Sequence, residues 1–271
     1  MFDSPVPCLF ESALLQRRVE RVLAGSGLEI WVPGHIDDLG QFPEEIGVVV
    51  LEGRLLSQGA HRKALVRLKK PLSHLRAIVL LQNREAVPHP PSFPPSEVCA
   101  IPWELQSLRR RIEWARLDAW KFRVNHKIRH LSHLPTSLQE ALVAALNQRV
   151  PLGIGDREML RTEEAIARKI KVSRERLSRA AGVKGISLPS FLGACNALNA
   201  LAELKIERRS LNEVAIRMGY SGQSGLTELL KRTIAVAPKD ARSRPLVEWV
   251  RWWERHVLKP LPTRRDDGHR E

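Results

Sequence analysis

The chain has 271 residues, of which 43% are hydrophobic and 27% are charged, and its formal net charge is +14. This length and composition suit about one to three globular domains and exclude a disordered chain. The cysteines are Cys8, Cys99 and Cys195; their spacing disfavours a disulfide framework and a cysteine-based zinc site. No run approaches the ~18 apolar residues of a membrane span, and no signal peptide is visible, so we expect a cytoplasmic protein with no membrane partner.

The positive charge is concentrated in the C-terminal part of the chain. Residues 1–105 hold 11 basic and 12 acidic residues, whereas residues 163–243 hold 15 basic and 8 acidic residues. Basic domains accumulate near polyanions, because each neutralised phosphate releases counterions. The distribution favours a nucleic-acid partner for the C-terminal part over a merely soluble, arginine-rich surface.

Strands and helices alternate in the N-terminal part. Apolar runs predict strands over residues 28–32, 46–51, 77–82 and 98–101, after a first strand that ends before Phe10. Helices are expected over residues 11–27 and 55–72 and from about residue 104, whereas the prolines of residues 87–96 exclude a helix there. The first helix would bury one face, formed by Leu14, Leu15, Val19, Val22 and Leu23. This alternation predicts a parallel sheet with helices on both sides.

The order and lengths of these elements resemble a response-regulator receiver domain, which is a flavodoxin-like α/β fold. The resemblance places the phosphoacceptor position at Glu52, where a working receiver has aspartate. A receiver also needs an acidic cluster for Mg²⁺ and a lysine before a proline, but this chain offers only Glu11 after its first strand and has Ile101 before Pro102. We therefore expect a degenerate, unphosphorylated module without metal or cofactor. Glu52 could mimic a phosphorylated state, but we favour a solvated residue at the strand end.

A long helix is predicted from Trp103 to about Leu131, because residues 104–131 contain neither glycine nor proline. We assign its tryptophans to a core or a dimer seam rather than to a ligand cage; they are Trp103, Trp114 and Trp120. Three histidines recur on one face of this helix, at His126, His130 and His133. No carboxylate or cysteine stands beside them, so no metal site is predicted.

Two helix-turn-helix units are predicted after this helix. In the first, over residues 162–182, Thr162 and Ser173 cap the two helices and Leu177 points into the core. In the second, over residues 210–233, Ser210 and Glu213 form a capping box. Gly219 then ends its first helix in a left-handed turn, and Ser221 starts its second helix. A helix over residues 136–148 precedes the units, and one over residues 188–206 joins them.

Residues 135–243 resemble the DNA-binding domain of the AraC/XylS family of transcription regulators. The family's second unit opens on Gly-Tyr/Phe-Ser, continues with Lys-Arg and ends on Ser-Pro-x-x-x-Arg. Here residues 219–221 are Gly-Tyr-Ser, residues 231–232 are Lys-Arg and residues 237–242 are Ala-Pro-Lys-Asp-Ala-Arg. The chain departs from the family at Lys171 and Ala235, which are usually glycine, and at Ala181, which is usually aromatic.

The resemblance implies that the second helix of each unit enters the major groove, at successive grooves about 34 Å apart. In the first unit the candidate base contacts are Ser173, Arg174, Glu175 and Arg176. In the second unit they are Ser221, Gln223, Ser224 and Thr227. The candidate phosphate contacts are Arg179, Lys231 and Arg232. Arginine can read guanine and glutamine adenine, whereas serine and threonine are less selective.

The sequence therefore predicts a transcription regulator that binds double-stranded DNA and has no catalytic residues. Its predicted parts are a receiver-like domain (1–120), a helical linker (121–134), an AraC-like domain (135–243) and a tryptophan-rich helix with a disordered tail (244–271). We expect the tryptophans of the last part to pack within the chain. A homodimer, RNA polymerase and another regulator are further candidate partners. The alternative function is a signalling adaptor whose helical domain binds protein.

Overall fold

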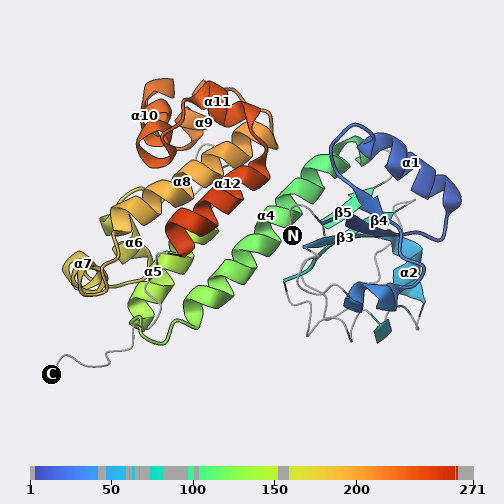
Figure 1. Cartoon of the computed structure of the whole chain (residues 1–271), viewed down its shortest axis with the longest axis horizontal. Helices are drawn as coiled ribbons and strands as arrows, with labels where there is room; N and C mark the ends of the chain where they lie inside the picture. Colours follow the sequence, from blue (N-terminus) through green and yellow to red (C-terminus); the bar gives the residue numbers. More distant parts are fainter. Residues whose placement is uncertain are drawn as a thin grey trace. The chain divides into compact units, whose positions relative to one another are not determined.

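The computed structural model describes residues 4–41, 47–58, 61, 63–64, 67, 74–81, 97–100, 104–151, 159–259 and 261. The chain divides into two compact units, Met1–Arg123 and Val124–Glu271 (Figure 1). The predictions for residues 82, 87–96 and 101–103, and most of those for residues 59–73, lie outside the described residues. Among the residues that are described, no helix is both long and apolar enough to cross a membrane.

A five-stranded parallel sheet forms the centre of the first unit. Its strands are β1 (Val6–Leu9), β2 (Ile30–Trp31), β3 (Val48–Glu52), β4 (Arg76–Leu81) and β5 (Glu97–Ala100). They lie in the order β2-β1-β3-β4-β5, and every neighbouring pair is parallel. This is the order of the flavodoxin-like fold, so the predicted receiver-like fold class is confirmed.

Helices cover both faces of this sheet, because successive side chains of a strand point to opposite sides. Val48 and Val50 of β3 pack with α1 (Ala13–Leu23) and with the first turns of α4 (Leu108–Arg129). Val49 and Leu51 instead pack with α2 (Gly53–Ser57) and the 3₁₀ helix Ile36–Gln41. Figure 1 shows α1 and α2 on opposite sides of the strands.

One residue of the face predicted for α1 lies outside it. Leu15, Val19 and Leu23 are buried at spacings of four residues, whereas Leu14 is 62% exposed. Residues at i, i+4 and i+8 form a narrow stripe along one side of a helix, and here this stripe is the part of α1 that is buried. Leu14 lies one position outside the stripe and is therefore exposed.

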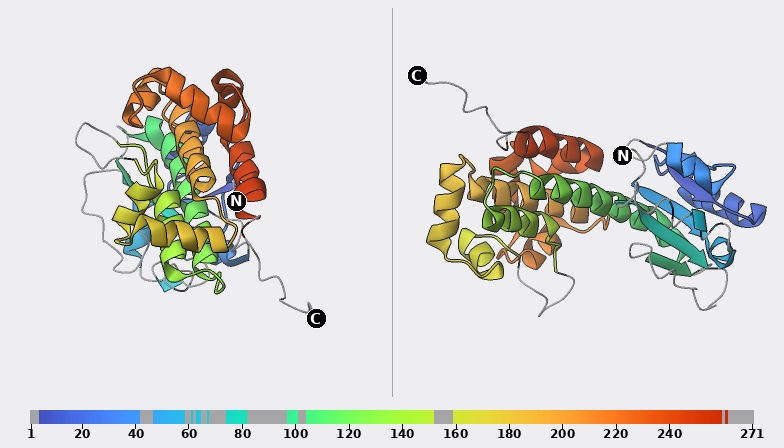
Figure 2. Two further views of the ribbon diagram at one scale, coloured as in Figure 1. Left: turned by 90° about the vertical axis from the view of Figure 1, so that its left-hand side faces the viewer. Right: turned by 90° about the horizontal axis from the view of Figure 1, so that it is seen from below.

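The second unit consists of helices. Besides the end of α4, they are α5 (Thr136–Asn147), α6 (Glu163–Lys169), α7 (Arg174–Val183), α8 (Leu188–Lys205), α9 (Leu211–Arg217), α10 (Gln223–Ile234), α11 (Pro238–Ser243), α12 (Leu246–Trp253) and a π-helical turn (Glu254–Leu258). The predicted helices over residues 136–148 and 188–206 correspond to α5 and α8. Figures 1 and 2 show the pairs α6–α7 and α9–α10 beside different parts of α8.

Helix α8 is the centre of this unit. Fourteen of its 18 residues are buried, as expected for a helix that is covered on every side. Helix α12 covers part of it: the rings of Trp253 and Phe191 meet edge to face at 5.6 Å. The Trp249 indole donates a hydrogen bond to the carbonyl oxygen of Ala241 at 3.0 Å. The expected packing within the chain is confirmed for Trp249 and Trp253, which are buried, whereas Trp252 is partly exposed.

Of the three histidines predicted on one face of the long helix, only His126 lies in α4, because the helix ends at Arg129, before His130 and His133. The rings of His126 and His130 stack at 4.1 Å. Within the described part of the chain, no three histidine, cysteine or acidic side chains stand close enough together to hold a metal ion.

Candidate nucleic-acid interface

The first helix-turn-helix unit is built from two capped helices. The Thr162 hydroxyl accepts a hydrogen bond from the Ala165 amide at 3.1 Å and so caps α6. The Ser173 hydroxyl accepts one from the Arg176 amide at 3.2 Å and caps α7 in the same way. Both predicted caps are confirmed, and Leu177 is buried as expected. Because Ser173 already accepts one bond from its own helix, its hydroxyl proton and its second lone pair remain for a ligand.

The two units repeat the same turn. In the first, Lys171 has a left-handed backbone (φ 59°) and the Val172 amide donates to the Ala167 carbonyl at 3.0 Å. In the second, Gly219 has φ 79° and the Tyr220 amide donates to the Ala215 carbonyl at 2.9 Å. These bonds span the same number of residues, so the two backbones follow one path. The prediction that Gly219 ends its helix is confirmed.

Lys171 adopts this conformation without being glycine. A left-handed backbone brings Cβ close to the following carbonyl and costs about 1–2 kcal/mol for an ordinary residue. Ala235 is likewise left-handed, at φ 54°, where it ends α10. Both positions are those at which the sequence departs from the glycine of the AraC/XylS pattern.

The exposed face of α7 carries most of the candidates of the first unit. Glu175, Arg176 and Arg179 are exposed side chains on this helix. Arg174 lies to one side, with its Nε 4.0 Å from a carboxylate oxygen of Glu163. Val183, which was not among the residues predicted from the sequence, is 76% exposed and follows Arg179 by four residues. That spacing was the available signal, and an exposed valine methyl could contact a thymine methyl.

The predicted capping box of the second unit is half formed. The Ser210 hydroxyl accepts a hydrogen bond from the Glu213 amide at 3.2 Å, as predicted. The Glu213 carboxylate does not complete the box; it accepts a hydrogen bond from the Arg209 guanidinium at 2.9 Å. A guanidinium is a stronger partner for a carboxylate than a backbone amide is, and this explains the difference.

The prediction that Ser221 starts the second helix is wrong by two residues, because α10 begins at Gln223. The ring of Tyr220 lies against the first turn of α10, where a Cβ on Gly225 would come within 2.6 Å of the tyrosine Cδ1. Gly222 is extended, at φ 175°, and carries the chain from this ring into the helix. Ser221 is exposed in the turn.

One face of α10 carries the remaining candidates. Ser224, Thr227 and Lys231 follow one another at spacings of three and four residues, with Gln223 and Arg232 on the flanks. The Thr227 hydroxyl donates to the Gln223 carbonyl at 2.8 Å, so its methyl group and lone pairs are what it can offer. Glu228, which was not among the residues predicted from the sequence, is exposed between Ser224 and Lys231. A carboxylate there can accept a hydrogen bond from the cytosine amino group.

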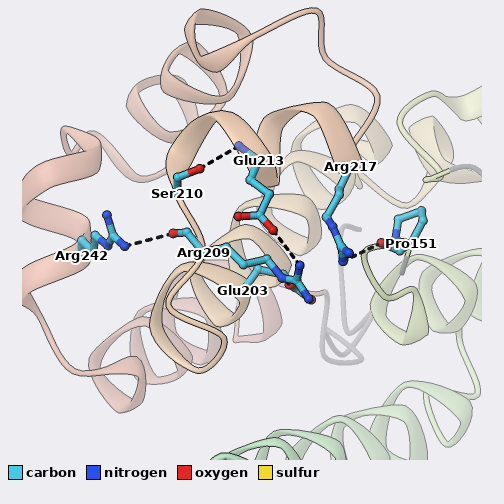
Figure 3. Close-up of polar contacts among 7 residues, drawn as sticks. All are labelled: Pro151, Glu203, Arg209, Ser210, Glu213, Arg217 and Arg242. Atoms are coloured by element: carbon cyan, nitrogen blue, oxygen red, sulfur yellow. Dashed lines mark hydrogen bonds and ion pairs between the residues drawn. The ribbon is translucent and has the colours of Figure 1, made fainter. Parts of the chain in front are cut away.

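A polar network holds the second helix-turn-helix unit in place (Figure 3). The Arg209 guanidinium lies 2.8 Å from the Glu203 carboxylate of α8 and 2.9 Å from the Glu213 carboxylate of α9. Arg242 of α11 donates to the Arg209 carbonyl at 3.0 Å. Burial raises the pKa of the Glu203 carboxyl, and the charge of Arg209 opposes that shift. The network thereby joins α8, α9 and α11, and Arg242 acts on the fold rather than on the exposed face.

Glu52 in the first unit is not a solvated strand-end residue, so the interpretation favoured from the sequence is wrong. Its side chain is buried, and Oε2 accepts hydrogen bonds from the Glu11 amide at 2.8 Å and the Ser12 amide at 2.9 Å. Ser12 in turn caps α1, because its hydroxyl accepts a bond from the Leu15 amide at 3.3 Å. The Glu52 carboxylate, at the position that the receiver resemblance assigns to the phosphoacceptor, therefore binds the loop between β1 and α1.

Comparison with solved structures finds full-length FixJ from B. japonicum, at 14% identity and a TM-score of 0.36, over 85% of this chain and 97% of that chain. It also finds the response regulator StyR, at 12% identity and a TM-score of 0.36, over 84% of this chain and 98% of that chain. No protein-family model and no curated protein matches the chain. Superpositions at this score are loose, so the fold assignment rests on the strand order and helix packing described above.

Proposed function

We propose that the protein is a sequence-specific DNA-binding transcription regulator of the AraC/XylS type. Its second unit reads duplex DNA with α7 and α10. Its first unit is a receiver-like module that is not phosphorylated and that serves dimerisation or the sensing of a partner. No catalytic step is part of this proposal.

The observation that carries the proposal is the repeated helix-turn-helix geometry. Both turns have a left-handed residue, Lys171 or Gly219, followed by an amide bonded five residues back. The helix after each turn presents exposed polar and basic side chains, as a helix in the major groove does. The net +7 of residues 163–243 supplies the long-range attraction to phosphate.

A signalling adaptor is the second candidate function. Val183 and Ile216 are 76% and 57% exposed, and apolar side chains in such positions also occur in protein contacts. An adaptor has no need of the basic surplus, and this favours DNA.

Genome-wide binding of the tagged full-length protein, followed by footprinting of the purified protein, tests the proposal. We expect a reproducible set of fragments and a footprint with two subsites about one helical turn apart. Selection of no fragment at all, under conditions where the protein co-purifies with another protein, would establish the adaptor instead.

A further inference from the structure

A cavity of about 450 Å³ lies between the two helix-turn-helix units. The beginnings of α6 and α7 line one part of it, the first half of α8 a second part, and Tyr220 with the last turns of α10 a third. Three arginines line it, and they come from three different segments: Arg161, Arg174 and Arg232. Arg174 and Arg232 are candidate DNA contacts from the sequence, and the structure brings them to one cavity.

The cavity has more positive than negative charge. Arg232 is exposed and, among the described residues, makes no hydrogen bond or ion pair. Arg174 faces Glu163 at 4.0 Å, which is too long for a hydrogen bond. The other carboxylate of the lining, on Glu164, lies 3.4 Å from Arg168 outside the cavity. Guanidinium groups that are not hydrogen-bonded to a carboxylate can bind a phosphate, whose oxygens accept two parallel N–H bonds from each arginine.

Arg161 holds the two sides of the cavity together. It stands directly before the cap of α6, and its guanidinium donates to the carbonyl oxygens of Met218, at 3.3 Å, and Gly219. The same guanidinium stacks over the Tyr220 ring at 4.7 Å. Because that ring packs on Gly225 in the first turn of α10, Arg161 connects the first unit to the recognition helix of the second.

We propose that this cavity binds a phosphate of the DNA backbone, between the base contacts of α7 and α10, with Arg232 and Arg174 as its ligands and Arg161 as a positioning residue. The inference rests on the proposed function. It favours the backbone over a free anion because Arg174 is the first residue of α7 and Arg232 follows Lys231 on α10. A phosphate seated there would fix the register of both helices on one duplex.

The test uses the full-length protein, a duplex that it selects, and the variants Arg232→Gln and Arg161→Gln. Arg255→Gln is the matched control, because Arg255 is exposed and lies outside the cavity lining. We expect Arg232→Gln to lower the slope of log affinity against log salt by about one, on specific and scrambled duplexes alike. The affinity that is lost between 50 and 200 mM salt should shrink roughly threefold. Arg255→Gln should leave the slope unchanged.

Duplexes with single neutral methylphosphonates between the subsites locate the contact. One position should weaken the wild type several-fold and have no further effect on Arg232→Gln. A positioning role for Arg161 predicts that Arg161→Gln tolerates a base pair inserted between the subsites better than the wild type does. Loss of stability alone would not produce this change in spacing preference.

The possible results distinguish failure of the cavity proposal from failure of the proposed function. If the wild type binds DNA and Arg232→Gln keeps its salt slope and its methylphosphonate profile, the cavity proposal fails and the proposed function stands. Calorimetry with inorganic phosphate at constant ionic strength reports a free-anion site. Binding of phosphate that requires Arg232, without any change in the DNA measurements, would overturn the backbone assignment. A wild type that binds no duplex overturns both proposals.

Discussion

Replacing Glu52 with glutamine should lower the unfolding free energy of the first unit, although the two side chains have nearly the same size. In Glu52→Gln the amide oxygen can still reach the amides of Glu11 and Ser12, which now lie 2.8 and 2.9 Å from a carboxylate oxygen. The charge is lost, however, and hydrogen bonds to charged groups contribute about 1 kcal/mol more than neutral ones. Two such bonds, together with the start of α1 close by, give an expected loss of about 2–3 kcal/mol.

The assay is urea unfolding of the full-length chain, combined with hydrogen exchange at residues 11 and 12. Glu11→Gln is the control, because it removes the same charge from the same loop, and the Glu11 side chain is exposed and accepts a hydrogen bond from the exposed Gln58. The control should change the unfolding free energy by less than about 0.5 kcal/mol, as surface substitutions do. Equal stability of the two variants, with unchanged exchange at residues 11 and 12, would refute the role assigned to Glu52.

Three further predictions concern other parts of the chain. Lys171→Gly should raise the unfolding free energy of the second unit by about 1 kcal/mol, because it relieves the left-handed residue. Lys169→Gly, at the last residue of α6, should instead lower it, because glycine is a poor helix former. Calorimetric melting that shows no difference in sign between the two variants would contradict the strain argument. Arg176→Ala should cost about 1–3 kcal/mol on the selected duplex and relax one base position, whereas Lys231→Ala should weaken all duplexes alike; titration of specific and scrambled duplexes distinguishes these effects. Burial raises the pKa of the Cys8 thiol from 9.0 to about 12, so iodoacetamide at pH 8 should leave Cys8 unmodified until the protein unfolds; rapid labelling of the native protein, seen by mass spectrometry, would contradict this burial. Because the thiol of the unfolded chain ionises at a lower pH, the folded state should also lose stability as the pH rises above 9.

Local signals in the sequence were sufficient for the turns and caps. Thr162, Ser173 and Ser210 each bond an amide three residues ahead, and Gly219 needs only its own freedom to adopt positive φ. The alternation of strands and helices along the first unit likewise followed from the apolar runs. These features depend on neighbours along the chain, so the pattern of residues alone predicts them.

Contacts between distant segments were not predictable in this way. Glu52 bonds residues 40 and 41 positions before it, and Arg161 bonds carbonyls 57 and 58 positions after it. The sequence shows that each side chain is charged but not which backbone will stand opposite it. The left-handed backbone of Lys171 was also not predictable from its residue type, because lysine rarely adopts positive φ. On α10 the sequence suggested Gln223, Ser224, Thr227, Lys231 and Arg232 as contacts, but the exposed Glu228 was not among the predicted residues.

The packing of α12 on α8 limits how the second unit can be shortened. A fragment that stops at residue 243 would remove Trp253 from the Phe191 ring and Trp249 from the Ala241 carbonyl. It would leave an apolar strip of α8 open to water, and such fragments tend to aggregate or melt early. A recombinant version of this unit should therefore extend through Lys259, and a protease that cuts after α11 would destabilise the unit without cutting α7 or α10.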